Sequence, residues 1–199
     1  MSETTIVQQC LVPYLDVKKE GSPAARALAG LPYVRNIFKL LGHAEGLFPS
    51  VTGVFTSIFD HDKRALPLFD WQLIALRIAA AQEDAYEWEA NICVAQAKGM
   101  DEGKLQAIHD TPFKVQENNT GVWTSRDLAI LRLVDEQLAT HSNDKDTVDL
   151  LRKSMSLQEL MECYIIIGMY TMVSSICKGL RIDLDGEMPG LDKTIANIQ

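Results

Sequence analysis

The chain contains no Cys-x-x-Cys pair and no closely spaced histidines. Its four cysteines are far apart, and three of them lie in apolar segments with helical periodicity; the four are Cys10, Cys93, Cys163 and Cys177. We interpret them as free, mostly buried thiols in a reducing compartment. The histidines form neither an HxxxH nor an HxH pair, so the spacing of a metal site is absent. We therefore expect neither a metal nor another cofactor.

Basic clusters are also missing. The formal net charge is -8, which makes nucleic acid and anionic membranes poor candidates as partners, and neither is expected. A membrane span needs about 20 apolar residues, whereas the most apolar run, from Cys163 to Cys177, is shorter and follows two glutamates closely. Residues 1–9 are polar and show no signal peptide. These absences predict a soluble, cytoplasmic protein.

Strand signals are nearly absent, because no segment alternates apolar and polar residues over several positions. Helix signals recur instead. Ser22 is placed to cap a helix that Gly30 ends, Gly99 is placed as a C-cap, and Ser156 with Glu159 has the spacing of a capping box. The expected class is therefore all-α. The expected helices cover residues 22–30, 34–41, 51–59, 68–82, 84–99, 101–109, 124–139, 144–153 and 156–180, with a polar loop over 111–121.

Two blocks of the chain line up without gaps when the sequence is shifted by 55 positions. The coinciding residues are Leu73, Leu76, Arg77, Gln82, Lys98, Met100 and Leu105 in the first block and Leu128, Leu131, Arg132, Gln137, Lys153, Met155 and Leu160 in the second. Both blocks predict three successive helices. This order favours a duplicated three-helix unit over chance similarity between amphipathic helices. The blocks differ most at the start of the second helix, so a special site there belongs to the first copy.

That variable segment carries a polar face. Asp84, Glu87 and Asn91 are spaced i, i+3 and i+7, which places them on one side of a helix. Trp88 lies beside this face. Gln72 lies near the start of the preceding helix, which a short link forces to pack nearly antiparallel. A pocket between the two helices could hold an amide, two carboxylates and an aromatic wall.

The polar face allows two interpretations. Two carboxylates a turn apart in a partly buried pocket repel each other, which raises one pKa toward neutrality and makes a general acid or base. Asn91 and Gln72 are neutral donors that could orient an enolate or a substrate carboxylate. Alternatively, the acidic residues only offset the helix dipole in the first turn. Spacing alone favours this second interpretation.

A more specific pattern surrounds the polar face. It consists of an L-x-x-L-R-I-A helix, a short link, a Tyr-Glu-Trp block and a glycine followed by a short acidic helix. Its residues are Leu73, Leu76, Arg77, Ile78, Ala79, Tyr86, Glu87, Trp88, Ala95, Gly99, Met100 and Asp101. This pattern resembles the core signature of the carboxymuconolactone decarboxylase and alkyl hydroperoxidase D-like superfamily. With a similar later helix, IIIGMYTMVSSI, the resemblance covers roughly residues 31–180.

The chain departs from that signature at its polar positions. Asn91 stands where the family usually has a histidine, and Gln72 aligns with a usual glutamate. The two cysteines of the peroxidase members align with Asp84 and Glu87. A dithiol peroxidase without thiols has no nucleophile. The missing histidine also argues against ordinary muconolactone decarboxylation, because asparagine does not titrate near neutral pH.

The resemblance implies one carboxymuconolactone decarboxylase-like domain over residues 1–199, built as an alkyl hydroperoxidase D-like helical array. The core would cover residues 66–180, between an N-terminal helical arm (1–65) and a tail (181–199) that wraps the surface. Such folds bury large helical surfaces between subunits. The resemblance therefore also implies a homo-oligomer, as a dimer, trimer or hexamer.

The activity that the resemblance implies is that of a small-molecule enzyme without a cofactor. It would act on an acidic or enolisable compound by decarboxylation, elimination, isomerisation or cyclisation, and a role in secondary metabolism would fit. Glu87 would be the acid or base, with Asp84 as its coupled neighbour. The expected substrate-binding residues are Gln72, Tyr86, Trp88, Asn91 and Tyr170. The rival hypothesis is a catalytically inactive ligand-binding or scaffold homologue.

The missing cysteine pair generates a first prediction. We expect the protein to lack thiol-dependent peroxidase activity, because the positions of the reactive thiols hold carboxylates. Peroxide consumption in the presence of a dithiol reductant checks this, with the Cys93→Ser variant beside the unmodified chain. Peroxide reduction by the unmodified chain that disappears in Cys93→Ser would contradict the prediction.

Overall fold

The computed structural model describes residues 9–18, 21–31, 33–109 and 121–198, and all regular structure within them is helical. This confirms the all-α class. The helices in chain order are α1 (Pro23–Ala29), α2 (Asn36–Leu41), α3 (Phe48–Phe59), α4 (Leu68–Ala81), α5 (Ala85–Ala97), α6 (Glu102–Ala107), α8 (Ser125–Thr140), α9 (Lys145–Ser154), α10 (Leu157–Leu180) and α11 (Leu191–Asn197). The two repeat blocks fold as α4–α5–α6 and α8–α9–α10, the order that the duplication predicts.

The helix ends follow the local signals in the sequence. The Ser22 side chain accepts a hydrogen bond from the third residue of α1, and Gly30 is the C-cap of that helix. Ser156 and Glu159 form a complete capping box at the start of α10. Gly99 has a φ of 83°, the left-handed conformation that commonly follows a helix end and that favours glycine.

Three segments differ from the expected pattern or lie outside it. α3 begins at Phe48 rather than at residue 51, because Pro49 lies in the first turn, where no backbone N–H is needed. The tail carries a helix, α11, that the sequence pattern did not predict. The predicted polar loop over 111–121 lies almost entirely outside the described residues.

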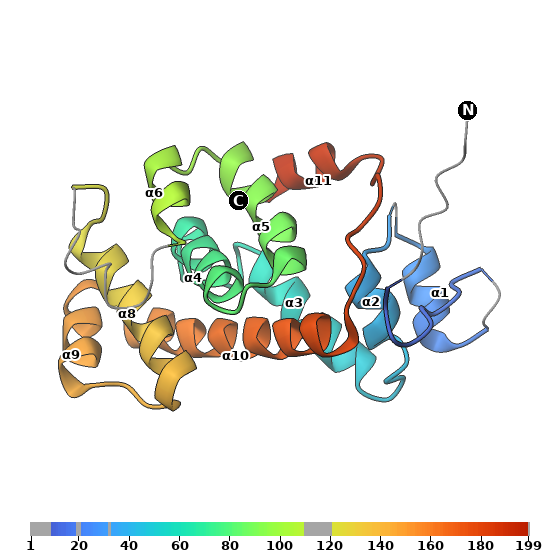
Figure 1. Ribbon diagram of the computed structural model, residues 1–199, viewed down its shortest axis with the longest axis horizontal. Helices are drawn as coiled ribbons and strands as arrows, with labels where there is room; N and C mark the ends of the chain where they lie inside the picture. Colours follow the sequence, from blue (N-terminus) through green and yellow to red (C-terminus); the bar gives the residue numbers. More distant parts are fainter. Residues whose placement is uncertain (1–8, 19–20, 32, 110–120, 199) are drawn as a thin grey trace.

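α10 runs along the lower side of the molecule in the view of Figure 1, from α8 and α9 toward the N-terminal arm. α8 and α9 lie at one end and the arm helices α1 and α2 at the other. α4 packs against α5, α8 and α10 at once. Its central residues are almost completely buried as a result, among them Leu73, Ile74, Ala75, Leu76 and Ile78. The main hydrophobic core is therefore centred on α4.

α10 is the one described helix that is long and apolar enough to cross a membrane by length and composition. Half of its apolar window is buried inside the protein, however. Its buried side chains include Cys163, Ile166 and Tyr170 in the main core and Cys177 in a second cluster with the arm. This packing is that of the core helix of a folded domain, as the sequence predicts.

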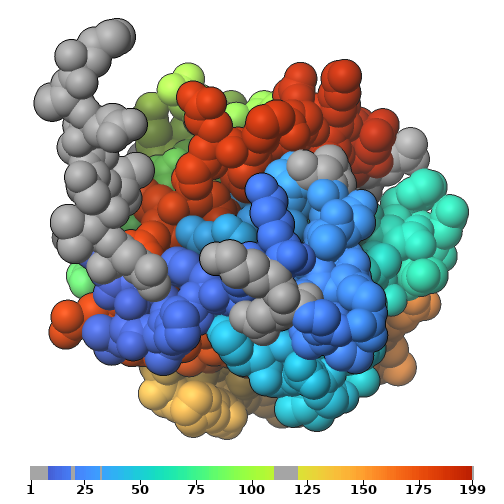
Figure 2. Space-filling model, turned by 90° about the vertical axis from the view of Figure 1, so that its right-hand side faces the viewer, coloured from blue at the N-terminus to red at the C-terminus, as the bar shows by residue number. Residues whose placement is uncertain are grey.

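The N-terminal arm is held on the core by the tail, as Figure 2 shows for this end of the molecule. The backbone N–H of Leu11 donates to the carbonyl of Leu180 at 2.8 Å. The carboxylate of Asp183 accepts the hydroxyl of Tyr14 at 2.9 Å. A second hydrophobic cluster joins the arm to α5 and α10 beneath these contacts. The two ends of the chain thus stabilise each other.

A buried ion pair joins the two repeat copies. The guanidinium of Arg77 in α4 donates from Nε to Oδ1 of Asp135 in α8 at 2.7 Å, and from Nη2 to Oδ2 at 3.1 Å. Arg77 also donates to the carbonyl of Ile108 after α6 at 2.6 Å. Its side chain is 1% exposed. One charge in the core therefore fixes α4, α6 and α8 relative to one another.

This ion pair generates a stability prediction. Arg77→Leu leaves the Asp135 carboxyl buried without its partner, and removing one member of a buried pair costs about 3–5 kcal/mol. We expect a loss of that size in the free energy of unfolding, measured with urea. Arg132 is the equivalent residue of the second copy. Its side chain is 31% exposed, and its ion pairs with Glu136 and Asp144 should be worth about 1 kcal/mol or less. An Arg77→Leu variant no less stable than Arg132→Leu would contradict the prediction.

Candidate functional site

The polar face of α5 is positioned by a tight link between α4 and α5. Glu83 has a φ of 52°, and the N–H of Asp84 donates back to the carbonyl of Ala79 at 2.8 Å. Asp84 then becomes the N-cap of α5, because its Oδ1 accepts the backbone N–H groups of Tyr86 and Glu87. The interpretation in which the acidic residues only offset the helix dipole therefore accounts for Asp84, whose Oδ1 caps α5. It does not account for Glu87, because the Glu87 side chain lies inside the protein.

The Glu87 carboxyl is buried beside Asn91. Glu87 is 4% exposed and Asn91 is 5% exposed. The Asn91 Nδ2 donates to the Glu87 Oε2 at 3.2 Å and to the Glu87 carbonyl at 2.9 Å. Burial raises the pKa of Glu87 to about 8, and the nearby Asp84 adds to this rise, while the Asn91 hydrogen bond and the charge of Arg35 oppose it.

A one-way chain of hydrogen bonds leads to this carboxyl. The indole N–H of Trp71 donates to the hydroxyl oxygen of Tyr170 at 3.0 Å, and that hydroxyl donates to Oδ1 of Asn91 at 3.0 Å. An indole nitrogen can only donate, so the direction of the chain is set at Trp71. Asn91 must therefore present its NH₂ group to Glu87. Burial and the Glu87 charge both raise the pKa of Tyr170, which keeps it a donor.

Several buried polar atoms of α4, of α10 and of the start of α5 have no hydrogen-bond partner within the described part of the chain. They are both amide atoms of Gln72, Oδ2 of Asp84, Oγ1 of Thr171 and Oγ of Ser174. Ser174 lies one turn after Tyr170 on α10, and Gln72 follows Trp71 on α4. Each such atom costs about 1–3 kcal/mol unless something pairs with it. Groups of this kind are what a polar ligand would engage.

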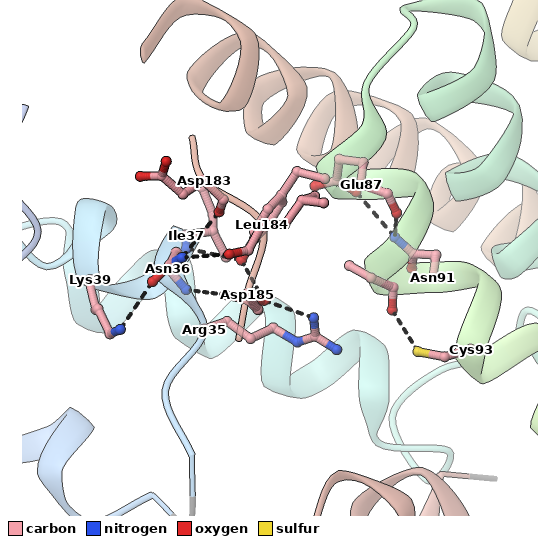
Figure 3. A network of polar contacts seen from close by, with 12 residues as sticks. Arg35, Asn36, Ile37, Lys39, Glu87, Asn91, Cys93, Asp183, Leu184 and Asp185 are labelled. Atoms are coloured by element: carbon pink, nitrogen blue, oxygen red, sulfur yellow. Dashed lines mark hydrogen bonds and ion pairs between the residues drawn. The ribbon is translucent and has the colours of Figure 1, made fainter. Parts of the chain in front are cut away.

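The arm and the tail meet beside this cluster (Figure 3). The Asp185 carboxylate accepts from the Arg35 guanidinium at 3.1 Å, from the Asn36 backbone N–H at 2.7 Å and from the Tyr86 hydroxyl at 2.9 Å. Tyr86 also accepts from the N–H of Ile37 at 3.2 Å. The Tyr86 hydroxyl therefore holds the arm and the tail together, and it makes no hydrogen bond to Glu87.

The other predicted site residues lie in different surroundings. Trp88 is partly buried, and its ring packs on His109 with the ring centroids 4.0 Å apart. The structure thus brings Asp84, Glu87, Asn91 and Tyr170 together. It turns Tyr86 and Trp88 toward other neighbours, and it joins Gln72 to none of them by a hydrogen bond.

Neither of the two described cavities borders Glu87. One of about 140 Å³ lies near Phe69, Met100 and Lys104, and one of about 400 Å³ lies between α3 and α10. A potential metal-binding group, Asp60 with His61 and Asp62, lies after α3, with ligand atoms within 4.8 Å of one another. His61 and Asp62 are exposed and paired with each other at 3.1 Å, which is typical of a solvated turn.

The arrangement of these helices is that of an alkyl hydroperoxidase D-like protein. It is similar to the crystal structure of an Agrobacterium tumefaciens protein of unknown function that has been proposed to be the antioxidant defence protein AhpD. The TM-score is 0.54, with 18% sequence identity over 83% of this chain and 97% of that chain. At this identity the likeness concerns the fold. No protein-family model matches the chain, and no curated protein does either.

Sequence reasoning missed four residues of the site. Trp71 begins the hydrogen-bond chain, Ser174 has an unpartnered hydroxyl, and Arg35 and Asp185 meet beside α5. Trp71 adjoins Gln72, so the helical pattern could have indicated it. Arg35 and Asp185 are 150 positions apart, and no local signal connects them.

The raised pKa of Glu87 predicts how stability depends on pH. The folded-state pKa is about 8 and the ordinary value is 4.5. The folded state therefore binds the proton more tightly, and its stability falls as pH rises from about 4.5 to 8. Glu87→Gln should remove this fall and make the protein more stable than the unmodified chain at pH 9, by a few kcal/mol.

The measurement is the free energy of unfolding at several pH values between 4.5 and 9. The matched control is Glu89→Gln, which changes an exposed carboxyl on the same helix. Parallel pH profiles for the unmodified chain and Glu87→Gln would mean that the Glu87 carboxyl is not held protonated by the fold.

Proposed function

We propose that the chain is a cofactor-independent enzyme, a lyase, isomerase or cyclase, that acts on an acidic or enolisable organic compound. Glu87 would serve as its general acid or base. The observation that supports this proposal is a buried carboxyl with a pKa of about 8, aligned by Asn91 and lying beside a second carboxyl. General acid–base groups work best when their pKa lies near the operating pH.

The same geometry defines which step Glu87 would perform. With a pKa of about 8, Glu87 is mostly protonated at pH 7, so it would act first as a proton donor. Asn91 holds Oε2 by its NH₂ group, which leaves Oε1 to carry the transferred proton. Asp84 would disfavour the charged form of Glu87 and so keep the proton available.

Substrate binding would use the polar groups that surround this carboxyl. Gln72 and Ser174 supply unpartnered hydrogen-bonding atoms, and Arg35 supplies the nearby positive charge that an acidic substrate requires. Since Glu87 is buried, the proposal needs the arm or the tail to move when substrate enters. The Asp185 contacts with Arg35 and Asn36 are the ones that would open.

The alternative is a catalytically inactive ligand-binding or scaffold homologue. It is favoured by the burial of Glu87 and by the position of both described cavities away from it.

We do not extend to this chain the antioxidant role that has been proposed for the Agrobacterium protein. Asp84 and Glu87 stand at the aligned thiol positions, and burial raises the pKa of Cys163 to about 12. We keep the homo-oligomer as a proposal for either function.

Proton transfer at carbon tests the proposed function without the full reaction. At pH 9, where Glu87 is mostly ionised and can remove a proton, we expect the protein to catalyse the exchange of an acidic C–H for C–D in D₂O. The compounds are β-keto acids and unsaturated lactone acids, and the exchange is followed by NMR. Glu87→Gln should slow the exchange by about a hundredfold, the usual size of an acid–base contribution. Glu89→Gln should leave it unchanged. Exchange at the buffer rate across such compounds, or equal exchange in Glu87→Gln, would favour the inactive homologue.

A further inference from the structure

One side of α10 is exposed and carries no charge. Its residues recur every three or four positions, which places them on one stripe of the helix. They are Leu157, Met161, Ile165, Gly168, Met172 and Ser175, and all six are exposed. Four of them have large apolar side chains. A helix surface that faces water usually carries charged and polar residues instead, so this stripe has the character of a contact surface.

α3 lies beside the stripe and extends the uncharged surface. None of the twelve residues of α3 is charged, although charged residues make up 23% of the chain. Val54 of α3 and Ile165 of α10 line the groove of about 400 Å³ between the two helices. The small residues Ser50, Gly53 and Ser57 of α3 leave this groove open. We call the stripe of α10 and the exposed residues of α3 the α3–α10 face.

The charges at the border of the α3–α10 face are matched within the chain. Glu162 accepts the backbone N–H of Leu66 at 2.7 Å and interacts with the guanidinium of Arg64. Lys63 pairs with Asp60 at 3.4 Å. The two acidic and two basic groups cancel, so this border selects neither an anion nor a cation. The molecule that covers the face should therefore be apolar and uncharged where it makes contact.

Two glycines of this face have no packing role within the described chain. Gly53 and Gly168 lie inside helices, where glycine is less favourable than alanine. A Cβ atom added at either position would meet no described atom within 4 Å, so neither glycine avoids a clash with its own chain. Small residues on a helix surface allow another helix to approach closely. Gly168 thus marks a place where a helix of another molecule could pack.

The α3–α10 face also has the extent of a subunit contact. α10 has 24 residues and α3 has 12, and at about 1.5 Å per residue and about 10 Å across they cover a flat area of roughly 500 Å². Protruding side chains make the accessible area larger than this flat area. A specific interface buries about 600–1,000 Å² on each partner, so the face suffices for a dimer at the lower end of that range.

We propose that a second copy of this chain docks on the α3–α10 face, with the two α10 helices antiparallel across a two-fold axis near Gly168. A two-fold contact uses the same patch on both copies, so an uncharged apolar stripe meets its own equivalent. The net charge of -8 makes two copies repel each other over most of their surface, which favours contact through a face without charge. The inference names a surface for the proposed homo-oligomer and is independent of the proposed activity.

The order of residues along the stripe fits this symmetry. Gly168 lies at the middle of α10, which runs from Leu157 to Leu180. An axis there would place Ile165 of one copy near Met172 of the other, because they are three and four positions from Gly168 on opposite sides. The missing side chain at the axis would let the two helices approach, and the flexible methionine side chains would fill the space between them.

The mass of the chain in solution tests the contact, by light scattering and sedimentation equilibrium at micromolar concentration. We expect particles of two chains or of a larger even number. Ile165→Lys would bury a charge in the contact on both copies and should weaken association by about a hundredfold or more. The matched control is Leu150→Lys on α9, because Leu150 is 47% exposed and Ile165 is 49% exposed. This control should assemble like the unmodified chain, and circular dichroism shows that the helices are retained.

Cysteine cross-linking tests the symmetry. A residue on a two-fold axis lies beside its own copy, so Gly168→Cys should give a disulfide-linked dimer when it is oxidised with diamide. The variant should fold, because the added Cβ meets no described atom. Leu150→Cys controls for random collisions, and the unmodified chain controls for its own four cysteines. Neither control should give this dimer.

Several results would overturn the proposal. A single chain at every concentration, or an odd-numbered assembly, would exclude the two-fold contact. So would an assembly that Ile165→Lys and Leu150→Lys affect equally, or one in which Gly168→Cys forms no more dimer than Leu150→Cys. A single chain that sediments with phosphatidylcholine vesicles, and that Ile165→Lys releases from them, would make the α3–α10 face a membrane contact.

Discussion

The positive charge of Arg77 is the constraint on which the rest of the structure depends. It lies in the middle of α4, the helix that α5, α8 and α10 surround, and a charge in that position is tolerated only with a partner. Asp135 supplies both oxygens, so α8 must lie in one register against α4. The first and second repeat copies are thus joined by a geometric requirement as well as by apolar contact.

The position of α4 then determines the surroundings of Glu87. Trp71 on α4 donates to Tyr170 on α10, and Tyr170 orients Asn91 on α5. Three helices therefore converge on one carboxyl, and each hydrogen bond has a fixed direction. Burial raises the pKa of this carboxyl, and Asn91 gives it a defined partner. Under the proposed function, these two properties are the ones that an acid–base group needs.

The outer elements add two features around this centre. The arm and the tail close over the start of α5, where Asp185 binds Arg35, Asn36 and Tyr86 together. The groove between α3 and α10 is open by contrast, because small residues of α3 leave it unfilled. Trp71 is close to both features, since Arg64 at the groove lies over its ring while its N–H begins the chain to Glu87.

The sequence by itself determined the all-α class, the order of the helices in the two copies and most helix ends, including the caps at Ser22 and Ser156. These follow from hydrogen bonds between residues three or four positions apart, which neighbouring residues encode directly. It also placed Asp84, Glu87 and Asn91 on one face.

Only the tertiary structure decided that Glu87 is buried, that Trp88 packs on His109, and that Arg35 meets Asp185. Contacts between different helices and segments depend on how several helices bury their apolar faces together, and no local pattern records that outcome.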